Sequence, residues 1–90
     1  MKVVILYRPD AEHFRKVETF VHDLRARHHN AQLDIVNIDS REGISMSGIY
    51  GIMQFPAIIA LSADGSMQQM WLGEELPLLD EVAAYIYSPR

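Results

Sequence analysis

The side chains best suited to chemistry in this chain lie around the end of its first apolar run. Tyr7 closes that run, and His13 follows where we expect the first helix to begin. The positive end of a helix disfavours a protonated imidazole, so His13 could act there as a neutral base or hydrogen-bond donor. No carboxylate partner can be assigned to it from the sequence, and a surface histidine without a chemical role is the simpler interpretation.

The other side chains that could react or bind metal give weaker evidence of a functional site. The chain contains no cysteine, which excludes disulfides, thiolate metal ligands and cysteine nucleophiles. His28 and His29 diverge by about 100° on a helix and cannot easily share one metal ion. Paired methionines, such as Met67 and Met70, more often fill gaps in a core than bind copper. We therefore expect neither a metal site nor a cofactor.

Composition and charge narrow the possible partners. The 90 residues are 49% hydrophobic and 22% charged, typical of a folded domain, and we expect residues 1–90 to form one domain. A net charge of −4 argues against binding to nucleic acid or to an anionic membrane. The longest apolar run, residues 55–61, is far too short to span a membrane, and the N-terminal run is too short for a signal peptide. A cytoplasmic location is the resulting expectation.

Hydrophobic periodicity gives the order of the elements that position these groups. It predicts strands over 2–7, 32–39, 57–62 and 67–72, and helices over 11–29, 40–52 and from Pro77 onwards. Asp10 is the expected N-cap of the first helix, and Leu78 is expected on the buried face of the last. A helix joins the first two strands, so they should be parallel. The prediction is an α/β fold, βαβ-α-ββα, with a mixed four-stranded sheet flanked by helices.

Several short motifs from residue 37 onwards form a pattern that resembles a known protein family. Asn37-Ile38-Asp39 closes the second strand, Tyr50-Gly51-Ile52 precedes a loop, and Phe55-Pro56 leads into the next strand. This pattern is similar to the second half of thioredoxins, whose proline at this position is cis. The resemblance implies a minimal thioredoxin-like fold, without the additional N-terminal strand and helix of full thioredoxins, and a cis bond between Phe55 and Pro56.

The chain departs from this family where its redox chemistry resides. Aligned without gaps, the two cysteines of the family's CxxC motif correspond to Ala11 and Phe14, and its buried acid in the first strand corresponds to Ile5. Neither alanine nor phenylalanine can act as a nucleophile. No thiol–disulfide oxidoreductase activity is therefore expected.

The resemblance implies a binding groove beside the proline, where an extended segment pairs with free backbone groups. Its expected lining is Tyr7, Pro9, Asp10, His13, Gln54, Phe55 and Pro56, with Trp71 a further candidate. The main hypothesis is a redox-inactive module that binds a protein or extended peptide. One alternative is a glutathione-binding enzyme, similar to transferases, that uses Tyr7 or His13. Another is an obligate subunit of a larger complex. A vestigial groove is a further interpretation, and the oligomeric state is not predicted.

Overall fold

The computed structural model describes residues 2–9, 12–29, 32–73 and 75–86. Within these ranges four strands and three helices follow one another along the chain. In order, they are β1 (Lys2–Tyr7), α1 (Phe14–Arg27), β2 (Leu33–Asn37), α2 (Arg41–Tyr50), β3 (Ala57–Leu61), β4 (Met67–Leu72) and α3 (Leu79–Ile86).

The strands form one mixed sheet in the order β2-β1-β3-β4. β1 runs parallel to β2, to which α1 connects it, and antiparallel to β3, which in turn pairs antiparallel with β4. A helical crossover between parallel neighbours is the connection that the sequence predicts. The predicted α/β architecture is confirmed.

The two central strands are apolar on both faces because helices cover both sides of the sheet. All five residues of β3 are buried, as are the four central residues of β1. Alternation along these strands divides the core into two clusters. One contains Val3, Ile5 and Ile58, and the other contains Val4 and Leu6 with their neighbours in β3.

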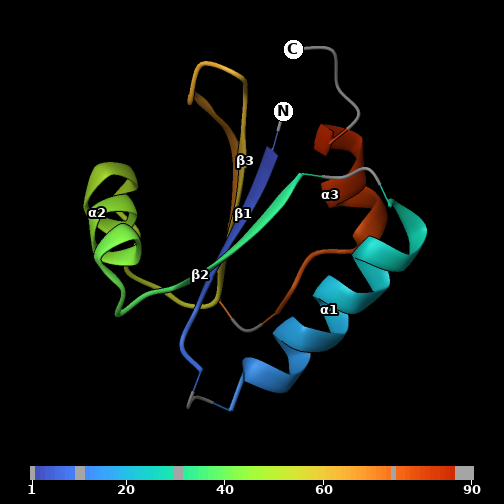
Figure 1. Ribbon diagram of the computed structural model, residues 1–90, viewed down its shortest axis with the longest axis horizontal. Coiled ribbons are helices and arrows are strands. Elements are labelled where there is room, and N and C mark those ends of the chain that lie inside the picture. The colour runs from blue at the N-terminus through green and yellow to red at the C-terminus, as the bar shows by residue number, and fades with distance from the viewer. Residues whose placement is uncertain (1, 10–11, 30–31, 74, 87–90) are drawn as a thin grey trace.

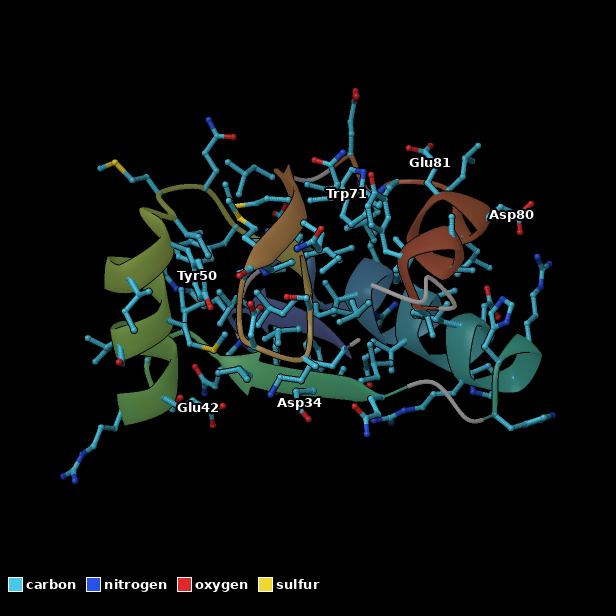
Figure 2. All side chains as sticks on the ribbon, turned by 90° about the horizontal axis from the view of Figure 1, so that it is seen from above. Asp34, Glu42, Tyr50, Trp71, Asp80 and Glu81 are labelled. Carbon is cyan, nitrogen blue, oxygen red and sulfur yellow. The ribbon has the colours of Figure 1, made fainter. Side chains whose placement is uncertain are left out.

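The two faces are covered unequally. Figure 1 shows α1 and α3 side by side on one side of the sheet and α2 alone on the other. α1 contributes four buried residues to the first cluster, and α3 contributes Val82. Within α2 only Gly43 is buried, although Met46 and Tyr50 pack against the second cluster from its side. Figure 2 shows Tyr50 directed from α2 toward the sheet.

Local contacts explain where α2 begins and how closely it approaches the sheet. Ser40 is its N-cap, and the Ser40 hydroxyl accepts a hydrogen bond from the Gly43 amide at 3.0 Å. A Cβ at Gly43 would lie 2.2 Å from the Asn37 carbonyl oxygen, so only glycine allows this approach. Gly51 ends the helix in the left-handed conformation, with φ of 65°.

Two predicted helix termini were wrong. α1 begins at Phe14 with His13 as its N-cap residue, so the helix starts later than expected. Asp10, the predicted cap, lies outside the described residues. Leu78, expected on a buried face, is 72% exposed because α3 begins only at Leu79; the buried positions of that helix are Val82 and Ala83.

Candidate functional site

The end of the sheet at which β1 stops and β3 starts brings the two expected halves of the site to one region. Leu6 pairs with Ala57 across the antiparallel ladder, so Tyr7 and Pro56 lie at the same end of adjacent strands. The peptide bond between Phe55 and Pro56 is cis. Pro56 is buried, and its carbonyl accepts a hydrogen bond from the Gly73 amide at 3.0 Å.

The residues before Pro56 present unpaired backbone groups. Among the described residues, none forms a hydrogen bond with the amide or the carbonyl of Phe55. The Phe55 side chain is half-buried against the second core cluster, whereas Gln54 is exposed and Met53 is 88% exposed. The loop thus has a free main-chain donor and acceptor, the groups with which an added strand pairs, next to an exposed apolar side chain.

His13 is not the surface residue that the sequence favoured. Its side chain is 6% exposed, and its Nε2 accepts a hydrogen bond from the Arg8 amide at 3.2 Å. An imidazole nitrogen that accepts carries no proton, so the ring proton resides on Nδ1 in this arrangement. His13 therefore closes the turn between β1 and α1, and Pro9 remains exposed on that turn.

Tyr7 is also engaged within the protein. Its ring stacks on that of Phe14, with centroids 5.5 Å apart and planes 23° apart. It packs against the cluster of Val3 and Ile5, on the face of the sheet that α1 covers, whereas Phe55 packs against the cluster on the opposite face. The structure therefore brings Tyr7 together with Phe14 and does not place the Tyr7 and Phe55 side chains in one lining.

Trp71, the additional candidate, also belongs to the face that α1 and α3 cover. Its ring meets that of Tyr85 edge-on with centroids 5.5 Å apart, and Figure 2 shows Trp71 beside α3. It packs against the same cluster as Tyr7. Trp71 therefore anchors the last helix to the sheet.

Several solved structures share this architecture. Thioredoxin 1 from Thermosipho africanus has a TM-score of 0.69 at 12% sequence identity, with 96% of this chain and 90% of that chain covered. The oxidized state of thioredoxin O2 from Arabidopsis thaliana gives 0.69 at 12% identity, covering 92% of this chain and 69% of that chain. A malarial protein gives 0.71 at 18% identity, covering 93% and 90%. The chain has the thioredoxin fold. No family model and no curated protein matches its sequence.

This thioredoxin-like chain contains no cysteine at any position. Of the two positions that correspond to the motif cysteines, Ala11 lies outside the described residues, as does Asp10 beside it. Phe14 is described, and its ring is committed to the stack with Tyr7. Of the described residues that the resemblance places in this motif, His13 closes the turn, Phe14 packs on Tyr7, and Glu12 is exposed.

Sequence reasoning missed two residues of this region. The Arg8 amide holds His13, but a backbone donor leaves no signal in the sequence. Met53 could have been noticed as an apolar residue inside a loop of the thioredoxin pattern, between Gly51 and Gln54, where no core position is expected.

At the opposite end of the sheet, the carboxyl group of Asp64 has a pKa clearly shifted from its usual value. The Ser62 hydroxyl and the Ser66 amide donate to the Asp64 carboxylate in the β3–β4 turn, and these hydrogen bonds lower the Asp64 pKa to about 2. In the described ranges, no three histidine or acidic side chains gather as metal ligands. No helix in these ranges is long and apolar enough to cross a membrane.

Proposed function

We propose that this thioredoxin-like chain is a binding module that takes up an extended segment of a partner protein at the loop before Pro56. The observation that carries the proposal is the unpaired amide and carbonyl of Phe55, beside the fully paired strand that starts at Ala57. A partner strand would satisfy both groups, and Met53 would provide apolar contact.

The binding surface is narrower than the groove expected from the sequence. A partner can reach the main chain of Phe55 and the exposed residues Pro9, Met53 and Gln54. His13 is buried, and Tyr7 is stacked on Phe14, so neither side chain is part of the proposed contact surface. This arrangement favours main-chain recognition of a peptide over chemistry by either side chain.

Peptide selection followed by NMR tests the proposal. Linear peptides are selected from a display library on the whole chain and titrated into isotope-labelled protein. The largest shifts are expected at the amides of Met53, Gln54 and Phe55. Met53→Asp should weaken binding by about tenfold or more, since it places a charge on the contact surface.

Met67→Asp is the matched control, because Met67 is a partly exposed methionine (43%) at the far end of the sheet. Shifts that cluster elsewhere, or equal weakening by the two substitutions, would contradict the proposal. A parallel titration with reduced glutathione examines the enzymatic alternative. That alternative requires shifts at Phe55 together with a turnover that Tyr7→Phe abolishes.

A further inference from the structure

β2 and β4 form the two edges of the sheet, and among the described residues no strand pairs with the outer side of β2, which we call the open edge. β2 pairs with β1 on one side only, and Figure 2 shows β2 at the margin of the molecule near Asp34. The Gln32 carbonyl accepts from the Val3 amide at 3.0 Å, and the Ile38 amide donates to the Tyr7 carbonyl at 2.9 Å. Backbone direction alternates along a strand, so the groups of Ile35, at an odd-numbered position between them, point to the free edge.

A cavity of about 320 Å³ lies between this strand and α1. Its apolar lining combines side chains from β1, α1 and β2. These are Tyr7, Phe14, Val17, Val21 and Ile35. The cavity therefore lies beside the backbone groups that the edge leaves unpaired.

The flank of α1 that borders the cavity carries a short charge pattern. Glu18, His22 and Arg25 line the cavity and are all exposed. Within the described part of the chain, neither Glu18 nor Arg25 forms an ion pair. Glu18 lies one turn before His22 and Arg25 one turn after it, so the flank is negative at one end and positive at the other. Such a pattern is complementary to itself when a second helix runs in the opposite direction.

We propose that the open edge is a dimer interface, at which β2 of a second copy of this chain adds antiparallel to β2. A twofold axis at Ile35 pairs the amide and carbonyl of each Ile35 with those of the other copy. The same axis sets the two α1 helices antiparallel on one face of a continuous sheet. Glu18 of each copy then faces Arg25 of the other, and the two Ile35 side chains close the cavities.

The self-complementary flank is what selects a second copy over another extended chain. An unrelated peptide would satisfy the Ile35 backbone groups equally well, but it would leave Glu18 and Arg25 without partners. Ile44 and Ile49 are also exposed, on α2, but the charged residues of that helix, Arg41 and Glu42, are adjacent at its start and are not spaced along one flank. This interface is independent of the loop before Pro56, because it uses the edge strand and α1.

Charge reversal tests the interface with the whole chain. We expect sedimentation equilibrium to give twice the 10.3 kDa of one chain for the wild type. Glu18→Arg and Arg25→Glu should each weaken self-association by about tenfold or more, because each replaces two attractive pairs by two repulsive ones. Mixing the two variants should restore a dimer, because every pair across the axis is then attractive. Lys16→Glu and Asp23→Arg, on the flank of α1 toward α3, are matched controls and should leave the dimer unchanged.

Hydrogen exchange locates the interface independently of the variants. The Ile35 amide should exchange more slowly as protein concentration rises, and the effect should disappear in Glu18→Arg. A wild-type monomer at millimolar concentration would overturn the proposal. So would a dimer that is insensitive to both reversals, or one in which the Ile35 amide remains unprotected.

Discussion

The two faces of this sheet differ in how much structure covers them. On one face, α1 and α3 bury a continuous cluster, and the turn before α1 is closed by a buried His13 and a Tyr7–Phe14 stack. On the other face, α2 lies alone, and the Phe55 loop keeps free backbone groups. Phe14, which the resemblance aligns with the second cysteine of the thioredoxin motif, stacks on Tyr7 at the closed face, whereas Phe55 in the proline loop packs at the open one.

This difference separates the position to which the resemblance assigns redox chemistry from the loop that we propose as a binding surface. Where no thiol has to be reached, packing can fill the space, as Phe14 does. A main-chain binding loop does not depend on cysteine, so its open groups can persist. The following substitutions test this contrast, in order of decreasing effect.

Leu24→Ala should have the largest effect on stability. Leu24 is fully buried in the cluster beneath α1, so truncation leaves a cavity and should lower the free energy of unfolding by about 2–5 kcal/mol. Ile49→Ala, at a 71% exposed position of α2, should change it by no more than about 0.5 kcal/mol. Urea denaturation of the two variants measures both. Similar losses in the two would contradict the proposed difference between the faces.

Gly43→Ala should lower the free energy of unfolding by a smaller amount, about 1–3 kcal/mol. Its methyl group would meet the Asn37 carbonyl oxygen and push α2 away from the sheet. Gly48→Ala is the matched control, since a Cβ there meets nothing within 4 Å. It should stabilise the helix by about 0.5–1 kcal/mol. Denaturation combined with hydrogen exchange in α2 separates the two results. A Gly43→Ala protein as stable as the wild type would show that α2 is not held by this approach.

His13→Ala examines the closed turn. The substitution leaves the Arg8 amide without its acceptor, and we expect a loss of about 1–3 kcal/mol. His29→Ala, at an exposed position, should remain within about 0.5 kcal/mol of the wild type. Thermal unfolding of both variants checks this expectation. If both substitutions changed the free energy of unfolding equally little, His13 would contribute no more to stability than a surface residue.

The sequence predicted the architecture because hydrophobic periodicity and turn residues are local signals. The buried run of β3 and the helical stripe of α1 lie where these signals placed them. The site was predicted less well. Whether Tyr7 faces Phe14 or Phe55 depends on which face of the sheet each side chain occupies. The resemblance indicated which residues lie near the proline, but it did not indicate on which face of the sheet their side chains lie. The burial of His13 depends on a hydrogen bond to a backbone amide, which no residue type specifies.

The smallest expected effect concerns the β3–β4 turn, which α2 contacts on the open face. The Tyr50 hydroxyl of α2 donates to the Gly65 carbonyl at 3.0 Å, and the neighbouring Asp64 orders this turn by accepting from Ser62 and Ser66. Because the Asp64 pKa is lowered to about 2, its contribution to stability is complete above about pH 4 and is lost as the pH falls through about 2.

NMR titration of the Asp64 carboxyl group should give a midpoint of about 2, and the Tyr50 ring signals should shift over the same range because α2 loses an ordered contact. Ser62→Ala removes the largest cause and should raise the Asp64 pKa toward its usual range. In Asp64→Asn the Tyr50 shift between pH 4 and 2 should be absent. A Tyr50 shift that persisted in this variant would separate the acid response of α2 from the turn and attribute it to the weak cover of that face as a whole.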